Sequence, residues 1–167
     1  MIKPKIIDYG LIFRSLLDRY STDKIIVHHT GNQVDDDLSA EELHNSHLAK
    51  GWSGVGYHFI IRKNGAIERG RPEWAWGAHA EQYNPYTLAV HLCGNFEIGE
   101  PTNEQIESTA YLIGYLCEEY GLPCTAEYVV GHRDLMPTAC PGENLYKILQ
   151  IIRGKGIWYQ EHYREGD

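Results

Sequence analysis

A histidine and a cysteine lie eight positions apart in residues 131–142, whose sequence is GHRDLMPTACPG. His132 and Cys140 bracket Pro137, and Pro141 follows them, so the backbone around the pair has restricted freedom. An imidazole nitrogen and a thiolate sulfur are ligands that zinc prefers in proteins. A further nitrogen ligand from elsewhere in the chain would make three, leaving one coordination position open, as in catalytic zinc sites.

That further ligand is expected far upstream, where the apolar run 25–27 is followed directly by His28 and His29. The β-branched residues of this run favour a buried central strand, whose end is a rigid place for a ligand. Neighbouring strand residues point to opposite faces, so spacing alone leaves both histidines open. A single histidine or cysteine in such a position is more often a structural residue.

Five short runs of apolar, aromatic and β-branched residues predict strands. The pair Asn64-Gly65 separates the second run from the third, and this dipeptide between such runs indicates a β-hairpin. The runs cover residues 25–29, 57–61, 66–69, 87–92 and 128–130. We therefore expect a mixed central sheet of about five strands.

Two capping boxes predict helix starts, Ser39 with Glu42 and Thr102 with Gln105. The helices are expected to end before Gly51 and Gly121, and a last amphipathic helix around 145–152 is expected to end at Gly154. The fold class is thus α/β, a single domain with helices on both faces of the sheet.

We predict an N-terminal arm over residues 1–23, with a helical turn at 11–17, packed on a domain over 24–154. The polar stretch 155–167 is expected to be a loosely held tail.

Composition narrows the function classes. The chain has 167 residues and a formal net charge of −8, which argues against binding nucleic acid through its phosphates. No run approaches the roughly 20 apolar residues that a membrane span requires. The N-terminus does not resemble a signal peptide, so we expect synthesis in the cytoplasm. A monomer is the default expectation.

Four cysteines are present, and in such a chain free thiols or a metal ligand are favoured over disulfides. Whether Cys117 and Cys124 pair is left open by their positions near a helix end.

Five segments, taken in order, resemble the zinc-dependent N-acetylmuramoyl-L-alanine amidase superfamily, which includes phage lysozyme-type amidases and animal peptidoglycan recognition proteins. They are 26–30 (IVHHT), 51–52 with 56–59 (GW and GYHF), 77–80 (GAHA), 84–90, and 131–142. The resemblance covers roughly residues 24–152. It implies zinc-dependent hydrolysis of the amide bond between the lactyl group of N-acetylmuramic acid and L-alanine in peptidoglycan.

The same resemblance assigns residues to this chemistry. The zinc ligands would be His28, the first of the histidine pair, together with His132 and Cys140. Tyr57 stands where the family has a tyrosine that hydrogen-bonds the reacting centre. Thr138 stands where phage members often carry lysine and recognition-protein amidases carry threonine. We therefore expect Tyr57 and Thr138 to be catalytic, with a packing role as the alternative for Tyr57.

Substrate contacts are expected from five further residues, each of which also has a structural alternative. They are His79, Asn84, Arg133, Trp52 and His58.

The alternative function is a non-catalytic peptidoglycan- or muropeptide-binding protein of the same fold. Such relatives typically lack the cysteine ligand, whereas Cys140 is present here. The expected place of action is the cell wall, in phage or prophage lysis as an endolysin, or the cytoplasm, in muropeptide recycling. The expected partner is peptidoglycan or a muropeptide.

Overall fold

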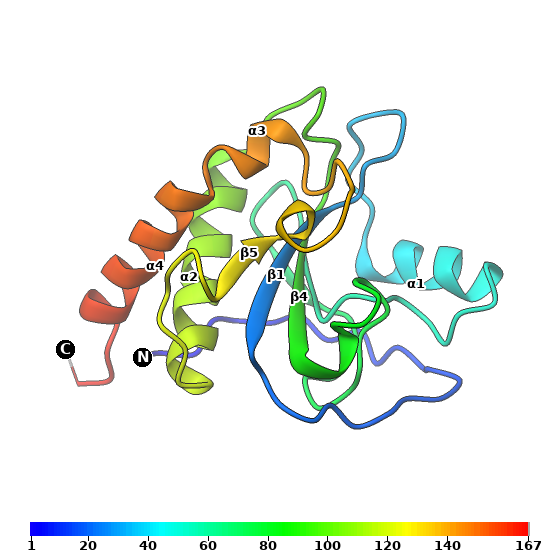
Figure 1. The fold of residues 1–167 in the computed structure, drawn as a ribbon, viewed down its shortest axis with the longest axis horizontal. Helices are drawn as coiled ribbons and strands as arrows, with labels where there is room; N and C mark the ends of the chain where they lie inside the picture. The colour runs from blue at the N-terminus through cyan, green and yellow to red at the C-terminus, as the bar shows by residue number, and fades with distance from the viewer. Residues whose placement is uncertain (167) are drawn as a thin grey trace.

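A five-stranded mixed sheet forms the centre of the computed structural model, which describes residues 1–166 (Figure 1). The spatial order is β3-β2-β4-β1-β5, and only the β2–β3 pair is antiparallel. The strands are β1 (Lys24–His29), β2 (Phe59–Ile61), β3 (Ile67–Arg69), β4 (Thr87–Leu92) and β5 (Val129–Gly131). The predicted α/β class and five-stranded sheet are confirmed.

Strand β1 lies between β4 and β5 and is buried from Ile25 to His29. Its β-branched side chains suit a strand that is covered on both faces. In the parallel register His28 is paired with His91, and Ile26 with Ala89, so these side chains share one face of the sheet. The carboxyl end of β1 therefore presents polar residues at one edge of a rigid apolar sheet.

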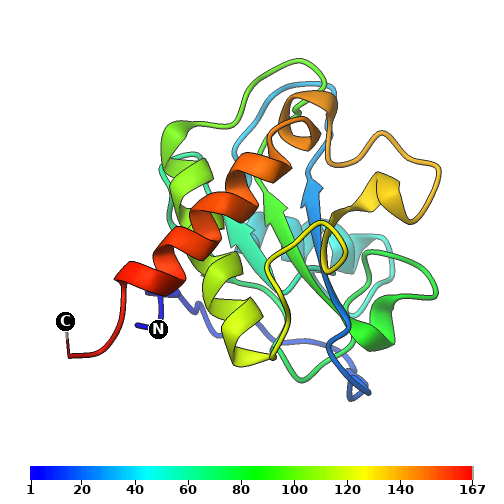
Figure 2. The same ribbon diagram turned by 60° about the vertical axis from the view of Figure 1, so that its left-hand side comes forward.

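Helices cover both faces, as Figure 2 shows. Helices α2 (Asn103–Glu119) and α4 (Leu149–His162) pack together over one face, against Ile25 and Val27. Helix α1 (Ala40–Ala49) contributes to a smaller apolar cluster with Ile60. Both predicted capping boxes are present, because Ser39 and Thr102 accept the backbone N–H of the residues three positions on. Helix α3 (Glu143–Tyr146) is a single turn before α4.

The C-terminal prediction is wrong. Helix α4 begins at Leu149 and continues through Gly154 to His162, so most of the expected loose tail is helical. The reason is tertiary, because Gly156 lies against Gly114 of α2, where a Cβ on Gly114 would come within 2.5 Å of the Gly156 carbonyl oxygen. The two glycines allow the helix backbones to approach closely, and this packing outweighs the weak helix propensity of glycine.

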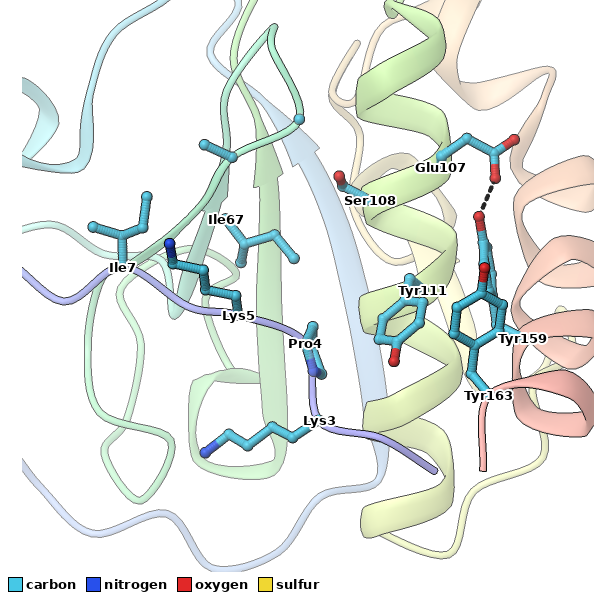
Figure 3. Close-up of a pocket in the computed structure, with 12 residues that line it drawn as sticks. Lys3, Pro4, Lys5, Ile7, Ile67, Glu107, Ser108, Tyr111, Tyr159 and Tyr163 are labelled. Atoms are coloured by element: carbon cyan, nitrogen blue, oxygen red, sulfur yellow. Dashed lines mark hydrogen bonds between the residues drawn. The ribbon is translucent and has the colours of Figure 1, made fainter. Parts of the chain in front are cut away.

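The N-terminal arm is extended, and the predicted helical turn at 11–17 is absent from the described chain. Ile7 forms a bridge to Glu68 of β3, and Asp18 forms one to Ala75. The arm, α2 and α4 border a cavity of about 570 Å³, shown in Figure 3. Tyr111, Tyr159 and Lys3 are among its lining residues, and none of the predicted site residues is.

Cys117 and Cys124 are free buried thiols rather than a disulfide. Among residues 1–166, no helix is both long and apolar enough to cross a membrane.

Candidate metal and catalytic site

The three predicted metal ligands meet although they are remote in the sequence. His28 ends β1, His132 begins a 3-10 turn (His132–Asp134) after β5, and Cys140 follows in the next loop. One possible ligand atom from each residue lies within 4.8 Å of the other two. Parallel strands β1 and β5 end at the same edge of the sheet, which explains why the two histidines converge there.

The structure distinguishes between the paired histidines. His28 Nδ1 lies 3.5 Å from Cys140 Sγ. Two ligands of a tetrahedral zinc ion, at about 2.0 Å for nitrogen and 2.3 Å for sulfur, would be about 3.5 Å apart. His29 points to the other face, where its Nδ1 accepts the backbone N–H of Phe96. The geometry therefore favours His28, which spacing alone left open.

The loop that carries His132 and Cys140 is closed by Arg133. Its backbone N–H donates to the Cys140 carbonyl at 2.9 Å, and its guanidinium also donates to the Ala139 carbonyl. Two carboxylates, Glu97 and Glu143, form ion pairs with the same guanidinium. The Arg133 donors are thus largely engaged within the chain, which favours a structural role over the predicted substrate contact.

The candidate ligand atoms of His28, His132 and Cys140 suit a bound cation. Burial, followed by the neighbouring His79 ring, lowers the pKa of His28 well below its usual value, and burial also lowers that of His132. Both imidazoles are therefore neutral at pH 7 and have a lone pair to offer. Burial raises the pKa of the Cys140 thiol to about 12, so a nearby cation is what would make it a thiolate.

Tyr57 lies beside these ligands. Its ring is 5.2 Å from the His28 ring and stacks on His91 at 4.5 Å, with an interplanar angle of 28°. Burial, followed by the nearby Cys140 sulfur, raises the pKa of Tyr57 above its usual value. The phenol is therefore protonated at neutral pH and can donate a hydrogen bond to an oxyanion.

Thr138 lies on the loop that carries His132 and Cys140, called the ligand loop below. Its hydroxyl oxygen accepts the Cys140 backbone N–H at 3.2 Å. This contact uses a lone pair and leaves the hydroxyl proton available for another partner. The loop thus carries one metal ligand and one hydroxyl donor two residues apart.

His79 and Asn84 lie next to the ligands, but their polar atoms are engaged. The two ring nitrogens of His79 lie within hydrogen-bond distance of His28 and Thr87. Asn84 Oδ1 accepts the backbone N–H groups of His79 and Ala80 at 3.0 and 3.1 Å. Both residues therefore organise the loop behind His28 in this structure.

His58 and Trp52 differ sharply in exposure. The His58 side chain has 0% exposed surface, its Nδ1 accepts the Ala89 N–H, and its Nε2 lies 2.8 Å from the Ala75 carbonyl oxygen. This burial corrects the prediction that His58 contacts substrate. Trp52 is 41% exposed and packs on His47, so its indole is available at the surface.

Two residues of this region, Thr87 and His91, were missed by the sequence prediction. Both project from β4 on the face shared with His28, and His91 Nε2 lies 2.9 Å from Thr30 Oγ1. Their spacing could have identified them. A threonine and a histidine four positions apart in a strand lie on the same face, and the rest of this strand is apolar.

Comparisons with known proteins agree with this architecture. The sequence family described as N-acetylmuramoyl-L-alanine amidase matches residues 18–143. The endolysin of Klebsiella phage KP32 is 33% identical over 128 residues, covering 76% of this chain and 85% of that protein. The endolysin of Escherichia phage T7 is 33% identical over 132 residues, with 76% and 85% covered.

A solved structure is similar over nearly the whole chain. The N-acetylmuramoyl-L-alanine amidase LysC from Clostridium intestinale URNW superposes with a TM-score of 0.82 at 34% sequence identity. The match covers 92% of this chain and 97% of that one.

Proposed function

Because this chain belongs to the N-acetylmuramoyl-L-alanine amidase family, we propose that His28, His132 and Cys140 hold the zinc ion of a peptidoglycan amidase. The observation that carries the proposal is the convergence of one ligand atom from each residue within 4.8 Å. Two neutral nitrogens and one sulfur suit zinc, and three protein ligands leave a position for water and substrate.

The family match supports the enzyme itself: the chain is an N-acetylmuramoyl-L-alanine amidase, and peptidoglycan is its substrate. This agrees with the function and the family expected from the sequence. The bond to be broken joins the lactyl group of N-acetylmuramic acid to L-alanine.

The zinc ion and the protein side chains would contribute different parts of the reaction. A bound zinc ion supplies Lewis acidity, which polarises a carbonyl and lowers the pKa of water. The phenolic O–H of Tyr57 donates a hydrogen bond to the oxygen that becomes negative as the lactyl carbonyl turns tetrahedral. Thr138 offers a second, neutral hydroxyl from the ligand loop, held by its bond to the Cys140 N–H.

The substrate surface is proposed next to these donors. Trp52 is the best-placed of the predicted contacts, because its exposed indole can pack on the apolar face of a sugar. His47 links it to the centre, with ring distances of 4.5 Å to Trp52 and 5.9 Å to Tyr57.

The alternative of a muropeptide-binding protein without activity is disfavoured by Cys140, which completes the ligand set. The cell wall is the place of action, and similarity to two phage endolysins supports lysis over muropeptide recycling.

The test combines metal analysis with product identification. We expect a chelator to abolish peptidoglycan digestion and one equivalent of zinc to restore it. Mass spectrometry should then find glycan with a free lactyl carboxylate and peptides that begin with L-alanine. Full activity of the metal-free protein would contradict the zinc proposal, and products cut at another bond would contradict the assigned reaction.

A further inference from the structure

A chain of hydrogen bonds runs from His28 away from the proposed metal position. His28 Nε2 lies 2.9 Å from His79 Nδ1, and His79 Nε2 lies 3.3 Å from Thr87 Oγ1. The Thr87 hydroxyl in turn donates to the Tyr83 carbonyl at 2.8 Å. The opposite ring nitrogen of His28, Nδ1, is the one that faces Cys140.

We propose that His79 is a positioning residue, anchored by Thr87, that fixes the tautomer and ring orientation of His28. The inference rests on the proposed function in one respect, since it takes His28 to be a metal ligand.

The direction of each bond follows from the fixed end of the chain. A backbone carbonyl only accepts, so the Thr87 hydroxyl proton is used by Tyr83. Thr87 Oγ1 then faces His79 with a lone pair and accepts the Nε2 proton of His79. A neutral imidazole carries one proton, so His79 Nδ1 is bare and accepts from His28 Nε2. His28 is left with an unprotonated Nδ1 toward Cys140.

The opposite arrangement is unfavourable. If His79 carried its proton on Nδ1, its bare Nε2 would face the lone pair of Thr87 at 3.3 Å. A proton on both nitrogens would place an uncompensated positive charge on a ring packed against those of His28 and His58, at 4.9 and 6.0 Å between centroids. One tautomer of each ring therefore satisfies every contact.

His28 therefore presents its unprotonated Nδ1 toward the metal position even in the metal-free protein. A histidine ligand whose other nitrogen donates to a fixed partner is held in the correct tautomer, and loss of such partners typically costs about 10- to 100-fold in metal affinity or activity. Asn84 holds His79 itself through the backbone N–H of that residue. This role accounts for both residues without a substrate contact.

The direct test is ¹⁵N NMR of the imidazoles in the metal-free protein. We expect protonated Nε2 and unprotonated Nδ1 on both His28 and His79. A His28 proton on Nδ1 would overturn the proposal. This readout needs neither zinc nor activity, so it stands even if the protein binds no zinc, a result that would defeat only the proposed function.

Thr87 offers a matched pair of variants. Thr87→Val removes the hydroxyl oxygen that accepts from His79 while keeping the shape of the side chain. A fraction of His79 should then adopt the Nδ1–H tautomer, and zinc binding should weaken about tenfold. Thr87→Ser keeps the hydroxyl and should stay within about twofold of the parent protein. Unchanged tautomers and zinc affinity in Thr87→Val would overturn the anchoring role.

His79 offers a second pair. The Oδ1 atom of His79→Asn can occupy the place of Nδ1 and accept from His28, so this variant should retain zinc better than His79→Leu. The expected loss in His79→Leu is about 10- to 100-fold in zinc affinity. Equal zinc affinity in the two folded variants would overturn the proposal, while leaving the zinc site itself in place.

Discussion

At the scale of single residues, the site depends on Cys140 being the one cysteine that faces the two imidazoles. The other three, Cys93, Cys117 and Cys124, are buried thiols away from the ligand group. Cys140 is therefore the residue whose replacement should remove metal binding with the least effect on folding.

Cys140→Ser should lose most of its zinc and nearly all amidase activity, because a serine hydroxyl is a far weaker zinc ligand than a thiolate. Zinc content by mass spectrometry and peptidoglycan turnover measure both effects. Cys124→Ser is the control and should keep one zinc per chain. Full turnover in Cys140→Ser would remove Cys140 from the site.

Tyr57→Phe should keep the metal and slow the chemical step. The phenyl ring can still stack on His91, whereas the hydroxyl that donates to the oxyanion is lost. Removal of one such donor typically lowers kcat by about 10²- to 10³-fold. Steady-state kinetics with equal zinc loading provide the measurement, and an unchanged kcat would leave Tyr57 with a packing role alone.

At the scale of elements, the approach of α2 to α4 holds the last helix in place. The same close contact explains why the end of the last helix was predicted wrongly, since α4 continues past the expected stop at Gly154 and packs on α2 through Gly156. Gly114 and Gly156 are 42 positions apart, and only the folded chain shows that they meet.

Gly114→Ala should destabilise the fold by about 1 to 3 kcal/mol, because the new methyl group meets the Gly156 backbone. Gly154→Ala is the matched control in α4. A Cβ at Gly154 has no neighbour within 4 Å, so this change should stabilise by about 0.5 to 1 kcal/mol through helix propensity. Urea unfolding measures both, and equal shifts would contradict the close packing.

At the scale of the whole molecule, buried neutral histidines tie stability to pH. Burial lowers the pKa of both His58 and His91 to about 3, and neither has exposed surface. Both would titrate near 6.5 once unfolded. The unfolded chain thus takes up protons first, so their contribution is complete above pH 6.5 and is lost as pH falls toward 3.

The metal-free protein should therefore lose about 2 kcal/mol of unfolding free energy per buried histidine between pH 7.5 and pH 5. Urea midpoints at the two values provide the measurement, with His58→Asn as the comparison, since it removes one titrating ring. Equal midpoints at pH 7.5 and pH 5 would show that these histidines take up protons in the folded protein as readily as in the unfolded chain.

The sequence predicted the sheet, the capped helices and the ligand types, because each depends on local pattern or on residues near strand ends. The choice of His28 over His29 came from the family resemblance, because strand alternation does not show which face of the sheet holds the site. The burial of His58 and the contact of Thr87 with His79 depend on the packing of distant segments. No local pattern carries that information.

X-ray absorption at the zinc edge reports which atoms surround the metal, and so whether His28, His132 and Cys140 bind one zinc ion. We predict one sulfur at about 2.3 Å and two imidazole nitrogens at about 2.0 to 2.1 Å. The sulfur shell should disappear in any zinc left on Cys140→Ser. A wild-type spectrum without a sulfur neighbour would exclude Cys140 as a zinc ligand.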